Sequence, residues 1–416
     1  MYENDVNGTV SQGGAVGWGR RLHYEEVYLG LCCLWFGWNL IRQIGWASGS
    51  ILGISRDLIS QYVLNTVLIG LALLLVFARR YRERETIRIM IITILVALTV
   101  WKSGLTELLV LWLLVAAGKG VQLRRIIRVA YVQLASAVII LLILYLTGTV
   151  EDSIVIRKDS GQICHSLGFE GANHLGMRVF QLATCHVYLH WGQMHLKDYL
   201  LIALTAIASR MVLGCETAEY CLLLLLAAAV LLPWLGSMWK KGYVIIADMM
   251  AVAVGLCSAV TVCLTIIGTG EKGGLLYKID QWLSGRFILG HILFLEYGTK
   301  WFGQDGILLS ASQRAAAGLK GERWLDSSFA LLLIRGGIVI TALMFVGLTV
   351  AAWRLRRVRP LALILCLNAA YGLMEPYQVY VSYNVFLLCL IWAVFPEVQV
   401  QKAVPDRRQH MAAEFL

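Results

Sequence analysis

Residues 245–267 read IIADMMAVAVGLCSAVTVCLTII, and a much more polar segment, 268–326, follows them. A membrane-spanning helix needs about 20 consecutive, mostly apolar residues, and the first stretch meets this requirement. The second stretch is too polar to cross a bilayer, and the next apolar run, 327–350, begins where it ends. The fold therefore depends on how often the chain repeats this alternation.

The composition of the whole chain favours a membrane protein. Of its 416 residues, 59% are hydrophobic and only 15% are charged, whereas a soluble domain is close to half apolar and about a quarter charged. The net charge is +10, and the basic residues stand in short clusters between apolar runs. Such clusters are typical of membrane topology signals, so we expect no nucleic-acid partner.

Apolar runs recur along the chain and predict about twelve spanning helices. Basic residues are concentrated in alternate connections, such as 79–88 and 354–359, so the positive-inside rule places both termini in the cytosol. We predict an all-α polytopic membrane protein forming one integral domain, 1–416, with outer loops at 148–172 and 268–326. The predicted helices are centred on 26–45, 61–78, 87–101, 103–118, 127–147, 175–191, 198–213, 218–236, 245–267, 327–350, 360–374 and 381–396.

Charged residues gather at the outer ends of the predicted helices. Arg178, Arg210, Arg335 and Glu375 lie there, and Arg286 lies in the long outer loop. Charges within membrane spans are costly and are typical of functional sites, and guanidinium groups bind phosphate oxygens through two parallel hydrogen bonds. A lipid-linked pyrophosphate would fit these arginines. Alternatively, each arginine extends to the membrane interface or pairs with a nearby carboxylate.

Further candidates flank the helices. The segment 165–176 is polar and rich in glycine, and its Asn173 is either a helix N-cap or part of a site. Asp326 precedes an apolar helix, so it either caps that helix, a role that Ser327 could also fill, or acts as a base. The ten cysteines lie mostly in apolar runs, where they are interpreted as small hydrophobic residues, and no Asp-x-Asp motif is present. We therefore expect no metal or other cofactor.

Several short stretches resemble, in order, motifs of Wzy-type polysaccharide polymerases in the O-antigen polymerase and ligase superfamily. The stretch 165–176 is similar to the family's His-Ser-Leu-Gly-Phe-x-His-Pro-Asn-x-x-Gly, with Gly171-Ala172 in place of His-Pro. Asp326 stands where the ligase branch has His, which favours a polymerase. The other similar stretches are Ala208-Ser209-Arg210, Leu283-Ser284-Gly285-Arg286, Trp301-Phe302-Gly303, Leu325-Asp326-Ser327-Ser328, Arg335-Gly336-Gly337, Glu375-Pro376 and Tyr383-Asn384.

This resemblance implies a glycosyltransferase-C-like bundle in the bacterial cell (plasma or inner) membrane. It would join oligosaccharide repeat units carried on undecaprenyl pyrophosphate at the outer face. The implied partners are a lipid-linked donor and acceptor, membrane lipid, a flippase and a chain-length regulator. The implied site residues are Arg286, Arg210, Arg178, Arg335 and Asn173 for pyrophosphate or glycan binding, and Asp326, His165 and Glu375, in that order, for proton transfer.

Two other functions are compatible with the sequence. An O-antigen-ligase-type transferase would use the same phosphate site with a different acceptor. A lipid-linked oligosaccharide flippase or transporter would also have many helices. However, a transporter places its polar residues near the membrane midplane between symmetric halves, whereas the charges here gather at one side.

Overall fold

The fold is described here from a computed structural model. Some predicted segments lie outside the residues that the structure describes: 306–324 of the long loop, 157–160 of the first outer loop, and the ends 44–45 and 61–64 of two predicted helices. The described residues are 14–43, 50–51, 54–55, 65–156, 161–271, 273–305, 325–358 and 360–398.

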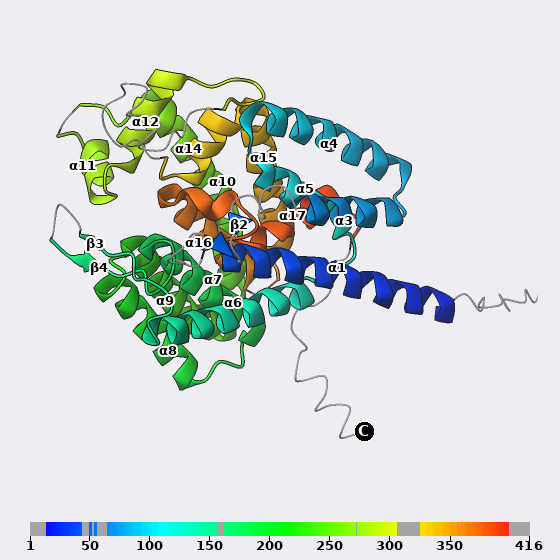
Figure 1. Cartoon of the computed structure of the whole chain (residues 1–416), viewed down its shortest axis with the longest axis horizontal. Coiled ribbons are helices and arrows are strands. Elements are labelled where there is room, and N and C mark those ends of the chain that lie inside the picture. The colour runs from blue at the N-terminus through cyan, green and yellow to red at the C-terminus, as the bar shows by residue number, and fades with distance from the viewer. Residues whose placement is uncertain are drawn as a thin grey trace, which may run out of the picture.

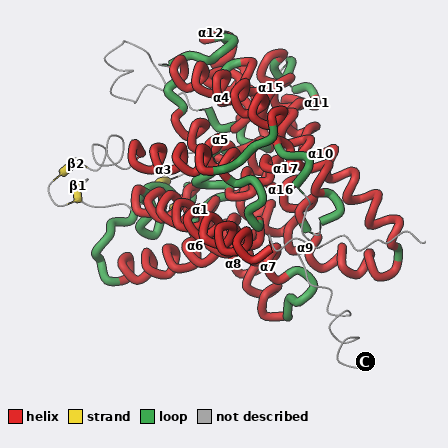
Figure 2. The backbone as a smooth tube through the Cα atoms, turned by 90° about the vertical axis from the view of Figure 1, so that its right-hand side faces the viewer, coloured by secondary structure: helices red, strands yellow, loops and turns green. Residues whose placement is uncertain are grey.

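The described chain is a helical bundle with two short antiparallel hairpins (Figures 1 and 2). Strand β1 (Ser50–Ile51) pairs with β2 (Ile54–Ser55), and β3 (Val155–Ile156) pairs with β4 (Ile163–Cys164). The α-helices are α1 (Gly14–Arg42), α3 (Asn65–Ala78), α4 (Glu83–Ser103), α5 (Thr106–Ala117), α6 (Leu123–Leu146), α7 (Ala172–His190), α8 (Leu196–Met211), α9 (Glu216–Met238), α10 (Lys240–Ile267), α11 (Leu275–Trp282), α12 (Arg286–Tyr297), α14 (Ser328–Leu331), α15 (Ile338–Leu355), α16 (Leu361–Met374) and α17 (Leu390–Val394).

Within the described residues, α4, α6, α9, α10 and α15 are long and apolar enough to cross a membrane. Their outer faces expose large apolar side chains such as Ile94, Ile139, Leu224 and Val252. A water-soluble surface rarely exposes so much contiguous apolar area. The chain is therefore an all-α membrane protein, and every apolar run predicted from the sequence overlaps a helix.

The predicted helix 327–350 is not continuous. Helix α14 passes into a π-helical turn, η2 (Leu332–Gly336), and the chain breaks at Gly337, whose φ is 90°, before α15 begins. The segment 300–304 fills the break, because Lys300 accepts the amide hydrogen of Ile338 and Gln304 donates its own to Arg335. Neighbouring backbone thus satisfies the groups that a broken helix leaves free.

Two other predicted segments differ in detail. The run 381–396 forms a 3₁₀ turn, η4 (Val385–Cys389), followed by the short α17. The described part of segment 268–326, which is predicted to face the outer side, contains the helices α11 and α12, which were not predicted from the sequence. A further 3₁₀ turn, η3 (Pro376–Val379), follows α16.

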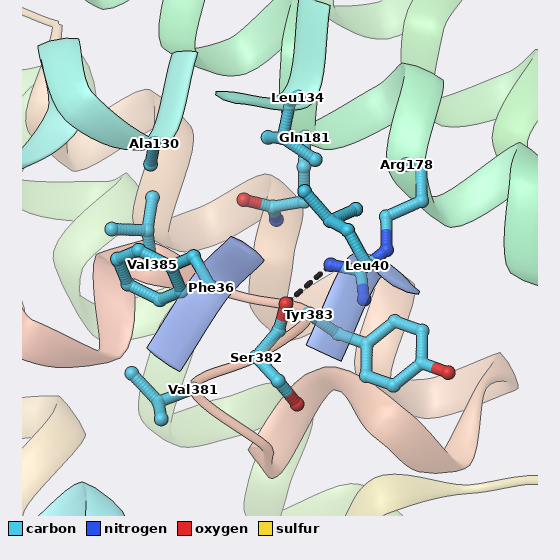
Figure 3. Close-up of a pocket in the computed structure, with 10 residues that line it drawn as sticks. All are labelled: Phe36, Leu40, Ala130, Leu134, Arg178, Gln181, Val381, Ser382, Tyr383 and Val385. Carbon is cyan, nitrogen blue, oxygen red and sulfur yellow. Dashed lines mark hydrogen bonds between the residues drawn. The ribbon is translucent and has the colours of Figure 1, made fainter. Parts of the chain in front are cut away.

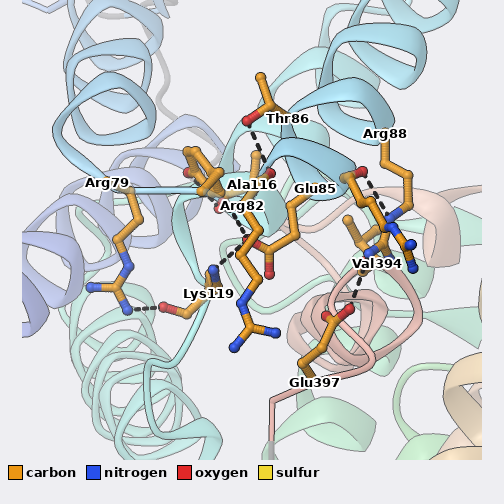
Figure 4. A network of polar contacts seen from close by, with 11 residues as sticks. Arg79, Arg82, Glu85, Thr86, Arg88, Ala116, Lys119, Val394 and Glu397 are labelled. Carbon is orange, nitrogen blue, oxygen red and sulfur yellow. Dashed lines mark hydrogen bonds and ion pairs between the residues drawn. The ribbon is translucent and has the colours of Figure 1, made fainter.

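The two ends of the bundle differ in charge. One end holds the arginine-rich connections, where Lys119 pairs with Glu85 at 2.6 Å and Arg88 pairs with Glu397 at 3.2 Å (Figure 4). The other end carries α11, α12 and the hairpin β3–β4 (Figure 1). Exposed tryptophans such as Trp101 and Trp353 lie toward opposite ends, as expected for side chains at the two membrane interfaces.

Candidate functional site

A narrow pocket opens at the end of the bundle opposite the arginine-rich connections. It is formed where the starts of α7 and α9, the turn between α11 and α12, and the end of α16 meet. Three residues predicted from the sequence, Asn173, Arg286 and Glu375, line this one pocket although they are far apart in the chain. The other lining residues are Cys215, Glu216, Thr217, Tyr220, Trp282, Leu283, Ser284 and Met374.

Arg286 and Glu375 form an ion pair in this pocket, with Nη1 of the arginine 3.1 Å from Oε1 of the glutamate. Local backbone geometry positions the arginine at the first residue of α12. Ser284 and Gly285 both have positive φ, 65° and 72°, a region that glycine adopts without strain. The Ser-Gly pair therefore turns the chain sharply between α11 and α12 and directs Arg286 into the pocket.

Asp280 is a supporting residue that the sequence analysis missed. It is fully buried, and its two carboxylate oxygens accept the amide hydrogens of Phe287 at 2.8 Å and Ile288 at 3.1 Å. A carboxylate at the start of a helix satisfies free N–H groups and interacts favourably with the helix dipole. The sequence signal that could have identified Asp280 is its position six residues before Arg286. Asp280 thus fixes the helix turn from which Arg286 projects.

Glu375 lies just after α16, outside the apolar helices, and is 3% exposed. Burial raises the pKa of Glu375 to about 7, although the Arg286 guanidinium opposes this effect and the nearby Asp326 carboxylate adds to it. Burial also raises the pKa of Asp326, against the opposing charge of Arg286. One guanidinium therefore faces two carboxyl groups that ionise less readily than usual.

The backbone around Glu375 is held by hydrogen bonds from the start of α14. Ser328 donates its hydroxyl to the carbonyl of Glu375 at 2.6 Å and accepts the amide hydrogen of Gln378 at 3.1 Å. Ser327, the second candidate for the cap, occupies the N-cap position of α14 without a capping side-chain hydrogen bond, so the alternative that Asp326 caps this helix is wrong. Asn173 is likewise not an N-cap, because α7 begins at Ala172 with Gly171 in the cap position.

Arg210 forms an ion pair with Glu216, which lines the pocket. Its Nη1 atom is 2.5 Å from Oε1 of Glu216, a lining residue, and its Nε atom is 3.8 Å from Oε2 of Glu219. The side chain is 40% exposed, so an anion at the mouth of the pocket could exchange with these carboxylates. Arg210 therefore does not line the pocket itself but contacts the lining residue Glu216.

His165 lies in the loop 148–172, before α7, and does not line the pocket. Its Nδ1 atom is 2.6 Å from Oδ2 of Asp152. Burial would raise the pKa of Asp152, but hydrogen bonds from His165 and from the amides of Leu167 and Ser166 lower it. The amide of His165 donates to Val212 at 2.9 Å, so the loop packs on the turn between α8 and α9 that borders the pocket.

Arg178 is enclosed in a separate small cavity (Figure 3). It is 2% exposed, and its Nε donates to Gln43 at 3.0 Å, while Nη1 donates to the carbonyl of Ser382. The guanidinium also lies 4.1 Å from the ring centroid of Tyr383, a favourable cation–π distance. Arg178 thus connects α1, α7 and the segment before η4, and the structure does not bring it to the pocket.

Arg335 is also outside the pocket lining. Its Nε donates to the carbonyl of Ser103 at 3.1 Å, and its Nη2 atom is 3.6 Å from Oδ1 of Asp305. These contacts place it between the broken helix and the turn from α4 to α5. It therefore stabilises the backbone at this end of the bundle without lining the pocket.

The pocket can bind an anion through arginine and can accept a proton through carboxylate. Among the described residues, no group of three or more His, Cys, Asp or Glu side chains is arranged to hold a metal ion. The charged residues that meet here come from α8, α9, α12 and the segments bordering α14 and α16. No family model, curated protein or solved structure matches the chain.

Proposed function

We propose that the chain is a membrane glycosyltransferase that polymerises undecaprenyl-pyrophosphate-linked oligosaccharide repeat units into a surface or exopolysaccharide. The observation that supports this most is the buried pair of Arg286 and Glu375, with Asp326 near the guanidinium and Arg210 paired with the lining residue Glu216. In this proposal about twelve helices cross the bacterial cell membrane with both termini in the cytosol. The pocket then faces the outer side, where a flippase would deliver the donor.

The proposed mechanism begins with exchange of an anion at Arg286. Pyrophosphate oxygens of the donor replace Glu375 on the guanidinium, which suits two parallel hydrogen bonds. Glu375 then becomes a free carboxylate next to negative charge, and both Asp326 and the pyrophosphate favour its uptake of a proton. This exchange would convert a stable ion pair into a base at the moment when the donor is bound.

The transfer step follows from that arrangement. The acceptor hydroxyl oxygen attacks the anomeric carbon of the donor, and its proton passes to Glu375. The bond between the anomeric carbon and the pyrophosphate oxygen breaks, and the lipid pyrophosphate leaves with the electron pair. Arg286 and Arg210 stabilise the charge of the leaving group, which is electrostatic catalysis by preorganised groups.

Glu375 makes the proposed activity dependent on pH. Its pKa in the folded chain without donor is about 7, and a base works only when it is ionised, so kcat/KM for transfer, which reports the donor-free protein, should rise as pH increases through about 7. In Glu375→Gln this rise should disappear and the rate should fall by about 10²-fold or more. The measurement is kcat/KM for transfer against pH with purified protein and lipid-linked repeat units. If the rise persists in Glu375→Gln and vanishes in Asp326→Asn, the base is Asp326.

Loss of the gene distinguishes polymerisation from the two alternatives. A cell without a polymerase should accumulate single repeat units on the lipid carrier at the outer face, as measured by mass spectrometry of extracted lipids. Long chains retained on the lipid would instead indicate a ligase. Single units confined to the cytosolic face would indicate a flippase, and either result would reject polymerisation.

A further inference from the structure

A second, apolar cavity is separate from the proposed site. It has a volume of about 550 Å³ and lies between α4 and α15, with α5 and α17 behind it. Cavities that bind small molecules measure about 300–1,000 Å³. Its lining is almost wholly apolar and includes Ile92, Trp112, Leu343 and Val346. Trp112 donates its indole N–H to Thr93 at 2.8 Å, so its ring offers the cavity an apolar face.

The shape of this cavity suits a hydrocarbon chain. Its lining follows α15 from Ile338 to Val350, a helical distance of about 18 Å at about 1.5 Å per residue. One leaflet contributes about half of a hydrocarbon core that is about 30 Å thick. The cavity can therefore hold an extended acyl chain along the direction of the helices.

One end of the cavity carries positive charge. Arg88 lines this end of the cavity. Among the described residues, its guanidinium donates hydrogen bonds to the carbonyls of Arg84 and Val394 and to the carboxylate of Glu397. These bonds use three of the five N–H groups of a guanidinium. Arg84, one turn earlier on α4, is exposed, and this end belongs to the arginine-rich network of Figure 4. Juxtamembrane arginines attract anionic lipid headgroups.

We infer that the cavity between α4 and α15 is a specific binding site for an anionic glycerophospholipid of the membrane leaflet at the arginine-rich end. The lipid phosphate lies at Arg84 and Arg88, and one acyl chain lies in the cavity. The apolar length and the charge at one end fit the same ligand, whereas the additional cation of a zwitterionic lipid would offset the attraction of its phosphate to the arginines. This inference is independent of the proposed glycosyltransferase activity.

Native mass spectrometry of the full chain, released from micelles containing phosphatidylglycerol or phosphatidylcholine, tests the inference. Phosphatidylglycerol should remain bound preferentially. Arg84→Gln with Arg88→Gln should weaken its binding by about fivefold per arginine and weaken phosphatidylcholine binding less, so that the preference between the two lipids is lost. Ala342→Trp, at an exposed position of the cavity lining, should displace both lipids.

Two control variants should retain phosphatidylglycerol: Arg128→Gln, at an exposed arginine of α6, and Val252→Trp, at an exposed apolar position of α10. Equal retention of the two lipids by the unchanged protein would overturn the inference. So would displacement of phosphatidylglycerol by an equimolar polyprenyl phosphate, because the cavity would then belong to an isoprenoid tail. If Ala342→Trp does not fold, the arginine variants alone decide the result.

Discussion

Arg286→Gln should reduce repeat-unit transfer by about 10²–10³-fold, the loss typical when one group that stabilises developing charge is removed. The guanidinium sits in a buried pocket, 3.1 Å from Glu375, where water screens charge poorly. Glutamine preserves much of the side-chain volume but supplies no positive charge for pyrophosphate. The measurement is the rate of polymer formation by purified protein from lipid-linked repeat units.

Arg286→Gln should also change the stability of the protein in a pH-dependent way. This change distinguishes a misfolded variant from a folded variant that has lost transfer activity. Removing the arginine leaves Glu375 buried without its partner, which costs about 3–5 kcal/mol if the carboxylate stays ionised. Its pKa is already about 7 and rises further once Arg286 no longer lowers it. A carboxyl group whose pKa is higher in the folded chain than in the unfolded chain stabilises the folded state fully at pH values below its unfolded pKa. This stabilisation is lost as pH rises through its folded pKa. Arg286→Gln should therefore be folded at pH 6 and less stable at pH 8.

Two variants serve as controls for the arginine. Arg286→Lys keeps the charge but not the planar fork, so it should recover only part of the rate. Arg356→Gln removes an arginine paired with Asp248 at 2.7 Å at the opposite end of the bundle, and it should transfer repeat units at the normal rate. Full-length polymer made by a folded Arg286→Gln protein would reject the catalytic role.

The sequence was sufficient for the helices because a spanning helix is defined locally by its length and apolar content. It did not reveal α11 and α12, which have only 8 and 12 residues and are less apolar. It also missed the break at Gly337, because this break depends on a segment 33 to 37 residues earlier in the chain, 300–304. Local patterns identify elements, whereas contacts between distant segments decide how those elements end.

The candidate site divides in the same way. Arg286, Glu375 and Asn173 meet in one pocket, and the sequence could group them only through predicted membrane topology. That argument placed Arg178 at the same depth but could not show that Gln43 and Ser382, which are distant in the chain, enclose it. Membrane topology predicts only how deep a residue lies in the bilayer. Its position around the helical bundle depends on how the helices pack.

Gly303→Ala should destabilise the protein by about 3 kcal/mol or more, which is a large effect for the addition of one methyl group. Gly303 has a φ of 80°, and a Cβ there would lie 2.3 Å from the carbonyl oxygen of Arg335. Backbone strain and overpacking each cost about 1–3 kcal/mol, and the neighbour here is backbone, which cannot move aside as a flexible side chain can. Thermal unfolding in detergent measures the loss.

Gly270→Ala is the matched control, because its φ is 78° and no atom lies within 4 Å of the added Cβ. It reports backbone strain alone, and the difference between the two variants isolates the close contact at the broken helix. Gly337→Ala should resemble Gly303→Ala, since its Cβ would lie 2.3 Å from the amide nitrogen of Gly303. If all three variants unfold at similar temperatures, segment 300–304 can shift, and the break before α15 does not depend on this contact.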